Sequence, residues 1–172
     1  IGYSFLPSPR IKIKDLIIKD FVDKEKTFGR IDNVAIKLSF YHLYNKNKLN
    51  FTKMMLQNAE INLDLHNLKK YKNFFKKKFN SKPINLKKGE IKFFDGEKDI
   101  ATIRDVNFKY KTNKNTDDVI LKGNFLNDDI YINLKNKKNK NELSKIFILK
   151  VLDSNTKVNM FNSDSDNKTT SG

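Results

Sequence analysis

The sequence predicts a mainly β protein in which an antiparallel meander forms a curved, groove-like sheet with one short amphipathic helix. Apolar and polar residues alternate in one run after another, and this spacing places the apolar side chains on one face of each strand. Short polar turns join most of these runs, which is typical of antiparallel strands. Only residues 68–79 follow helical spacing instead. The sheet therefore has one apolar face, and the function depends on what covers that face.

The clearest alternation lies in residues 33–66, where two runs flank a polar turn at 43–49. The first run places four apolar side chains on one face, namely Val34, Ile36, Leu38 and Phe40. The second run does the same with Ile61, Leu63 and Leu65. Residues 54–56 fit neither the helical nor the strand period, so the residue at which the second strand begins is not determined.

Before these runs, Pro7 and Pro9 indicate an extended entry, because proline lacks a backbone donor and keeps its neighbour out of a helix. Residues 11–18 alternate as a strand, and the apolar stretch at 16–18 indicates either a slipped register or a bulge. The charged segment 20–30 is predicted to be a loop that returns to the strand beginning at Asn33.

After Pro83 the alternation resumes and continues almost to the end of the chain. Asp95-Gly96 is a strong hairpin signal, since these residues tolerate the positive φ angles of tight turns, and residues 100–103 should pair back across it. Further strands are expected in the segments 84–93, 106–110, 119–125, 130–134, 144–152 and 158–160. Residues 1–162 are thus predicted to form one domain, followed by a disordered polar tail at 163–172.

The predicted helix carries apolar residues on one side and lysines on the rest of its surface. One interpretation places it on an anionic membrane surface, through Lys69, Lys70, Tyr71, Lys72, Phe74 and Phe75. A second is nucleic-acid binding, and a third, which we favour, is a cap over the open end of the sheet. Nucleic acid is disfavoured because only Arg10, Arg30 and Arg104 are arginines, the residue best suited to bidentate phosphate contacts.

Composition excludes several classes of chemistry. The chain has no cysteine, so it has neither disulfides nor thiolate metal ligands, and its only histidines are His42 and His66. No nucleophile motif or phosphate-binding glycine loop occurs, so we expect neither enzymatic activity nor a cofactor or metal. No apolar run reaches the ~20 residues of a membrane-spanning helix. The net charge of +15 accompanies a general richness in Lys, Asn, Ile and Phe, and we attribute it to the composition of the whole gene.

Two parts of the chain resemble the N-terminal region of AsmA-like proteins of Gram-negative bacteria. The first comprises Leu6-Pro7-Ser8-Pro9 with the strand after it, Asp32-Asn33-Val34-Ala35-Ile36-Lys37-Leu38-Ser39-Phe40, Leu43 with a short polar turn, Leu49-Asn50-Phe51 and Ala59-Glu60-Ile61-Asn62-Leu63. The second comprises Lys88-Gly89-Glu90-Ile91-Lys92-Phe93-Phe94-Asp95 and Ile103-Arg104-Asp105-Val106-Asn107-Phe108. The helix at 68–79 departs from the family, where many members have a short variable loop.

The resemblance implies a non-enzymatic periplasmic protein that is anchored to the inner membrane and carries a hydrophobic lipid groove for phospholipid transport and outer-membrane assembly. We expect the anchor to precede Ile1 in the gene. The expected partners are the acyl chains of phospholipids, which contact Val34, Ile36, Leu38, Phe40, Ile61, Leu63, Leu65, Ile91, Phe93, Val106, Phe108, Ile130 and Ile132. The alternative hypothesis is a closed β-domain that acts as a scaffold or binding module for an anionic partner.

Overall fold

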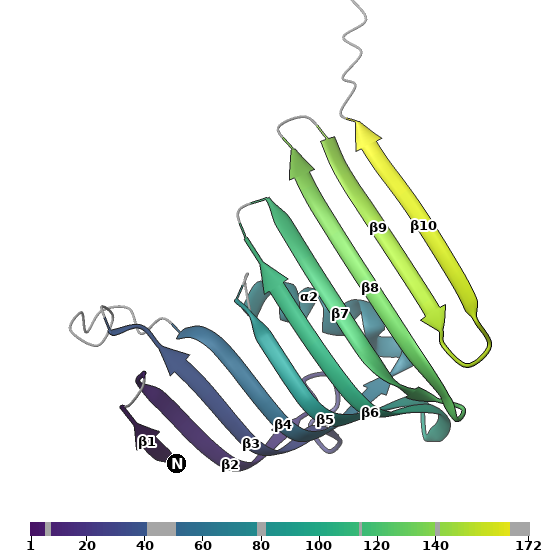
Figure 1. Ribbon diagram of the computed structural model, residues 1–172. Coiled ribbons are helices and arrows are strands. Elements are labelled where there is room, and N and C mark those ends of the chain that lie inside the picture. Colours follow the sequence, from purple (N-terminus) through teal and green to yellow (C-terminus); the bar gives the residue numbers. More distant parts are fainter. Residues whose placement is uncertain (6–7, 41–50, 79–81, 114, 140–141, 166–172) are drawn as a thin grey trace, which may run out of the picture.

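The computed structural model describes residues 1–5, 8–40, 51–78, 82–113, 115–139 and 142–165. In this part of the chain ten strands form a single sheet, and their order in the sheet is their order in the sequence (Figure 1). The strands are β1 (Gly2–Ser4), β2 (Arg10–Lys19), β3 (Thr27–Leu38), β4 (Phe51–Asp64), β5 (Ile84–Asp95), β6 (Lys98–Thr112), β7 (Thr116–Phe125), β8 (Asp128–Asn139), β9 (Glu142–Val151) and β10 (Thr156–Ser165). A 3-10 turn, η1 (Leu65–Asn67), leads into the helix α2 (Leu68–Lys78).

The predicted fold class, a mainly β curved sheet with one short helix, is confirmed, and the strands are antiparallel with a single exception. The prediction of an antiparallel meander is wrong between β4 and β5, which pair in parallel. Parallel neighbours need a crossover connection, because the chain must return to the end at which the first strand began. Here η1 and α2 make that return.

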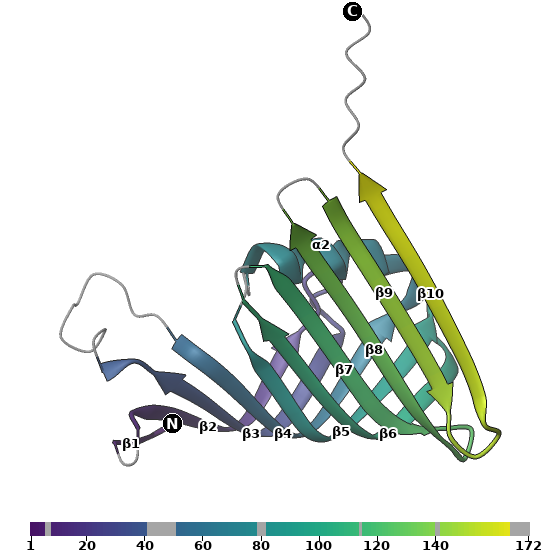
Figure 2. The same cartoon turned by 45° about the horizontal axis from the view of Figure 1, so that its top comes forward.

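A line of backbone irregularities crosses strands β2 to β6. Asp15, Asn58, Lys88 and Asp105 have positive φ angles of 54°, 53°, 55° and 50° although they lie inside strands. At this line two successive polar residues of each strand point away from the apolar face. The alternation of apolar and polar side chains therefore continues one residue out of step beyond the line. These residue pairs, which we call the crease, are Lys14-Asp15, Asp32-Asn33, Gln57-Asn58, Lys87-Lys88 and Arg104-Asp105. The sheet bends sharply along it (Figures 1 and 2).

The crease divides the sheet into two walls. Wall A contains the strand segments 10–14, 33–38, 51–57, 84–87 and 106–112, and β7 to β10 extend it. Wall B contains the segments 16–19, 27–31, 59–64, 89–95 and 98–104. We call the concave side between the walls the trough, its face the inner face, and the opposite side the outer face. The helix leaves the tip of wall B after Asp64 and the chain re-enters at the tip of wall A, so α2 crosses between the tips of the walls (Figure 2).

The fully buried core lies at the floor of the trough. It consists of Ile31, Val34, Ala59, Leu86, Ile103, Val106 and Ile130, and Val106 has no exposed surface. The bend brings inner-face residues on either side of the crease close together: a Cβ atom at Gly89 would lie 2.7 Å from Cδ2 of Leu86. Glycine at this position therefore lets the floor close without a void or a clash.

Several predicted boundaries need correction. β3 begins at Thr27, so the predicted loop at 20–30 is shorter, and β4 runs without interruption through residues 54–56. The register shifts between Ile18 and Lys19, which agrees with the predicted slip or bulge without deciding between them. The Asp95-Gly96 hairpin is confirmed, with φ +67° at Gly96. β10 continues to Ser165, so the predicted tail cannot begin at 163. The predicted turn at 43–49 and residues 166–172 lie outside the described residues.

Candidate functional site

Two unbroken rows of apolar side chains cross the inner face from β2 to β10. Neighbours within each row are direct partners in the strand register. The first row is Ile11, Ile36, Met54, Ile84, Tyr110, Val119, Leu134, Phe147 and Met160. The second row is Ile13, Val34, Leu56, Leu86, Phe108, Leu121, Ile132, Leu149 and Val158. With strands ~4.8 Å apart, each row is ~38 Å long, and we call the two rows together the apolar track.

Exposure along the inner face rises from the floor of the trough toward β10. The floor residues are buried, most of wall A is half-buried, and toward the far edge Leu134 is 42% and Met160 62% exposed. The described residues form one sheet with no second sheet packed on it, so the alternative of a closed β-domain is wrong about closure. An exposed apolar surface that continues from a protein core is a common feature of ligand grooves and of interaction sites.

Most of the residues predicted to contact lipid lie on this inner face. Val34, Val106 and Ile130 are in the buried floor. The half-buried residues above the floor are Ile36, Leu38, Ile61, Leu63, Ile91, Phe93, Phe108 and Ile132. The predicted strand positions of Phe40 and Leu65 are wrong, because Phe40 lies beyond the end of β3 and Leu65 is in η1. Both side chains are exposed, and their contact with lipid stays a prediction. Periodicity alone does not indicate where a strand ends.

Sequence reasoning did not include many of the track residues among the lipid contacts, and for three of them the reason is the crease. Met54, Leu56 and Leu86 stand out of phase with the apolar residues that follow them in their own strands. A test for strict alternation therefore splits each strand in two. The detectable signal is a polar pair flanked by apolar or small residues, repeated in the crease of five neighbouring strands.

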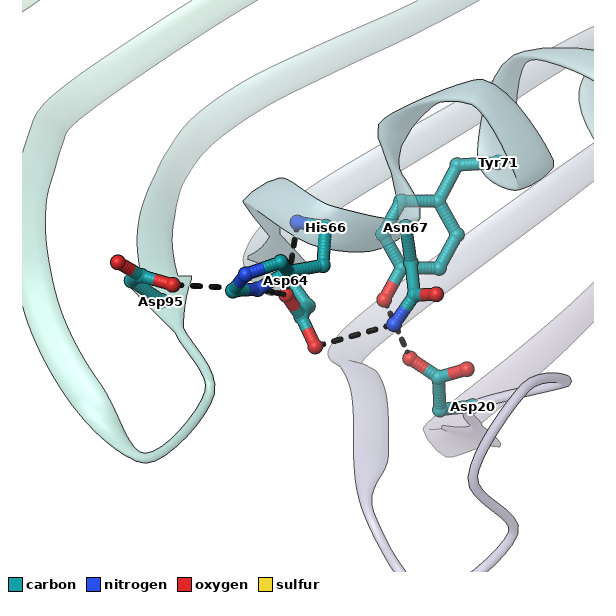
Figure 3. A network of polar contacts seen from close by, with 6 residues as sticks. All are labelled: Asp20, Asp64, His66, Asn67, Tyr71 and Asp95. Carbon is teal, nitrogen blue, oxygen red and sulfur yellow. Dashed lines mark hydrogen bonds and ion pairs between the residues drawn. The ribbon is translucent and has the colours of Figure 1, made fainter.

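Tyr71 fixes α2 to the tip of wall B. Its ring packs edge-on against Phe21 and Phe28, with centroids 5.2 and 5.3 Å away, and its hydroxyl donates a 2.6 Å hydrogen bond to the carboxylate of Asp20 (Figure 3). Burial, together with this bond to Asp20, raises the pKa of Tyr71 to about 12. The phenol therefore stays protonated and donates at any physiological pH.

These contacts correct the membrane-surface prediction for α2. Tyr71 is only 3% exposed, so it cannot dip into a bilayer while the protein is folded. Lys69, Lys70 and Lys72 are exposed, as both the membrane and the cap interpretations require. The side chains of Phe74 and Phe75 lie outside the described part of the structure. The position of α2 between the wall tips agrees with the favoured interpretation of a cap.

A polar network holds the turn between β4 and α2 (Figure 3). Asp64 accepts hydrogen bonds from the backbone of His66 at 3.0 Å and from the side chain of Asn67 at 3.0 Å, and the His66 ring lies 3.1 Å from a carboxylate oxygen of Asp95. Desolvation tends to raise the pKa of Asp64, but the hydrogen bonds from His66 outweigh it and lower that pKa. Asp64 thus acts as an N-cap residue, which is a structural role.

Among the described residues there is no group of three His, Cys, Asp or Glu side chains that could hold a metal ion. His42 lies outside the described ranges. Within those ranges no helix has both the length and the apolar character needed to cross a bilayer. The fold and the track together define a class of structure, an open and bent β-sheet with a continuous apolar concave face. No protein-family model matches the sequence, and neither does any of the curated proteins with which it was compared.

Proposed function

We propose that the trough is a lipid-binding groove that holds the acyl chains of phospholipids against the apolar track. In this proposal the protein is not an enzyme, and the lipid is a cargo that lies across the strands. Following the resemblance to AsmA-like proteins, its place is the periplasm, attached to the inner membrane, and its task is phospholipid transport to the outer membrane.

The observation that carries the proposal is the continuity of the track. A folded core needs apolar residues only where elements pack together, but here the apolar register continues through nine neighbouring strands to the exposed residues Val158 and Met160. Removing each methylene of an acyl chain from water gives ~0.8 kcal/mol. A track of ~38 Å therefore supplies enough contact area to hold a chain without specific polar contacts.

The outer face differs from the inner face in a way that fits this use. On the outer face Lys92 pairs with Glu60 at 3.0 Å, and Arg104 lies 3.7 Å from Glu90. On the inner face of wall A the apolar rows contain one polar group, the hydroxyl of Tyr110, which donates to Asp117 at 3.3 Å. A charged phospholipid headgroup would consequently lie at the rim of the trough, while its chains lie along the track.

Two matched variants test the proposal. Leu121 is in the middle of the track, and Ile120 is its neighbour on the outer face of the same strand. We expect the purified protein to carry co-purified phospholipid that is detectable by mass spectrometry and to take up a fluorescent phospholipid. Leu121→Asp should reduce uptake at least about tenfold, because a carboxylate would interrupt the apolar surface. Ile120→Asp introduces the same charge on the other face and should leave uptake nearly unchanged.

Both variants are first compared by thermal unfolding, so that uptake is judged only on folded protein. Lipid-free protein that also refuses added phospholipid would overturn the proposal. Equal losses of uptake in folded Leu121→Asp and Ile120→Asp would overturn it as well, since binding would then not depend on the inner face.

A further inference from the structure

Among the described residues of β2 to β6, the outer face of wall A carries cations and no carboxylate apart from those at its borders. Between β2 and β6 the charged residues described on this face are Arg10, Lys12, Lys14, Lys37, Lys53, Lys87, Lys109 and Lys111. Carboxylates appear only at its borders: Asp15, Asp32 and Asp105 lie in the crease, and Asp118 lies on β7 opposite Lys111. We call this surface the cationic face.

The outer face of wall B, built by the same strands, has a different arrangement. There Lys92 lies between Glu60 and Glu90, at 3.0 and 3.9 Å, and Arg104 approaches Glu90. A general richness in lysine would add positive charge to both walls alike. The separation of charge between the walls is therefore a property of this fold, which the composition of the gene does not explain.

The cationic face also contains a hollow of about 520 Å³. Its polar lining consists of Lys12, Lys14 and Lys87 with the amide side chains of Asn33, Gln57 and Asn85. These groups surround an apolar part that is lined by Ile13, Val34, Ala35, Met55 and Leu56. Lys14, Asn33, Gln57 and Lys87 are successive partners in the register from β2 to β5, so two lysines flank two amides across four strands. Ammonium and amide groups are donors that suit phosphate oxygens.

We propose that the cationic face docks on the surface of an anionic phospholipid membrane, with a headgroup phosphate in the hollow. Lysine is a flexible point charge, and it suits attraction to a fluid layer of headgroups. Nucleic acid fits less well, because the residues described on this face include a single arginine, Arg10, and no aromatic side chain on which bases could stack. This inference rests on the outer face and is independent of the lipid groove.

Vesicle sedimentation tests it with three variants of equal charge. The first, Lys12→Glu with Lys14→Glu and Lys87→Glu, changes the hollow. The second, Lys24→Glu with Lys26→Glu and Lys98→Glu, changes exposed lysines near the tip of wall B. The third, Lys69→Glu with Lys70→Glu and Lys72→Glu, changes α2. All three lose the same net charge, so they differ only in the place of the change.

We expect the unchanged protein to bind phosphatidylcholine vesicles that contain about one third phosphatidylglycerol and not pure phosphatidylcholine vesicles, with binding lost at about 1 M salt. The hollow variant should lose at least about tenfold in partitioning, and the other two less than about threefold. Circular dichroism melting establishes that each variant is folded. If the hollow variant does not fold, the lysines of all three variants are changed to glutamine instead, so that the loss of net charge stays equal.

Three outcomes would overturn the proposal. The first is a loss in the α2 or wall B variant as large as that in the hollow variant. The second is equal binding to neutral and anionic vesicles. The third is tighter binding to a single-stranded oligonucleotide than to the anionic vesicles at the same salt. None of these outcomes bears on uptake of lipid in the trough, so the two proposals fail separately.

Discussion

The hydroxyl of Tyr71 in α2 and the carboxylate of Asp20 at the end of β2 are joined by a 2.6 Å hydrogen bond, although 51 residues separate them in the sequence. Both side chains are buried, and the other oxygen of Asp20 accepts the backbone N–H of Val22 at 2.7 Å. Among the described residues, this hydrogen bond joins a side chain of α2 to the end of wall B. Together with the contacts of the Tyr71 ring with Phe21 and Phe28, it fixes the place at which α2 crosses between the tips of the walls.

Tyr71→Phe should lower the free energy of unfolding by roughly 1–3 kcal/mol, because it leaves the buried carboxylate of Asp20 without one of its donors. Tyr110→Phe is the matched control. The Tyr110 hydroxyl also donates to a carboxylate, that of Asp117 at 3.3 Å, but the pair is only part-buried, so we expect a smaller loss. Urea unfolding of both variants measures the difference. An equal loss of unfolding free energy in the two variants would show that the hydrogen bond to Asp20 contributes no more to stability than the hydrogen bond to Asp117.

The same contact predicts a dependence on alkaline pH. The pKa of Tyr71 is raised to about 12 in the folded protein, whereas an unfolded tyrosine ionises near ~10. The stabilisation from the neutral phenol is complete below pH ~10 and is lost as the pH rises toward 12, because the unfolded chain then releases the proton first. The stability gap between the unchanged protein and Tyr71→Phe should narrow over this range, by on the order of 1 kcal/mol. A gap that stays constant would contradict the raised pKa.

Gly123 lies on β7 beside Arg104 of the crease, and a side chain there has no space. A Cβ atom would come within 2.8 Å of the carbonyl oxygen of Arg104 and 2.8 Å of Cγ2 of Ile103. Because one of these atoms is backbone, relief requires a shift of β6, so Gly123→Ala should cost about 1–3 kcal/mol. Gly2→Ala, at a position with no atom within 4 Å, is the control and should be neutral. Chemical denaturation of both variants provides the comparison.

The sequence predicts the strands, the helix and the apolar face well because each depends on local periodicity. A search for alternating apolar and polar residues does not find the crease. A residue in the left-handed region, such as Lys88, moves the apolar positions of its strand by one residue, so the alternation is interrupted there. The parallel pairing of β4 and β5 was detectable, because a helix between two strands is the usual crossover of a parallel pair. The end of β4 was detectable too, since Asp64 has the residue type and the place of an N-cap.

Other features of the candidate site had no local signal. The contact between Tyr71 and Asp20 arises from the path of α2 across the trough, and no spacing in the sequence indicates it. The hollow of the cationic face depends on the register of four strands, β2 to β5, which decides that Lys14 and Lys87 flank the same two amides. The net charge of +15 does not predict the cationic face, because it does not show how the charged residues are distributed between the two walls.

The left-handed residues of the crease lead to a prediction with an unusual sign. Lys88 has φ 55°, a conformation that costs a residue with a Cβ roughly 1–2 kcal/mol. Lys88→Gly should therefore stabilise the protein, by up to ~1 kcal/mol, once the entropy of glycine in the unfolded chain is subtracted. Lys87→Gly, one residue earlier and also exposed, should destabilise it instead, since no positive φ is found at that position. Differential scanning calorimetry can separate the two, and a loss of stability in both would indicate that the bend does not depend on the φ angle of Lys88.

The difference between the walls and the floor predicts two different responses to an introduced lysine. Leu63 lies on the inner face of wall B and is half-buried, so an ammonium group there can reach water at the rim. We expect Leu63→Lys to stay folded, at a cost of about 1 kcal/mol, and to lose lipid uptake. Val106 has no exposed surface, and Val106→Lys would bury an unpaired charge at a cost of several kcal/mol, a large share of the stability of one domain. Melting curves measured beside fluorescent phospholipid uptake distinguish the two sites. If Leu63→Lys unfolds as Val106→Lys does, the wall belongs to a sealed core and the trough is not open to a lipid.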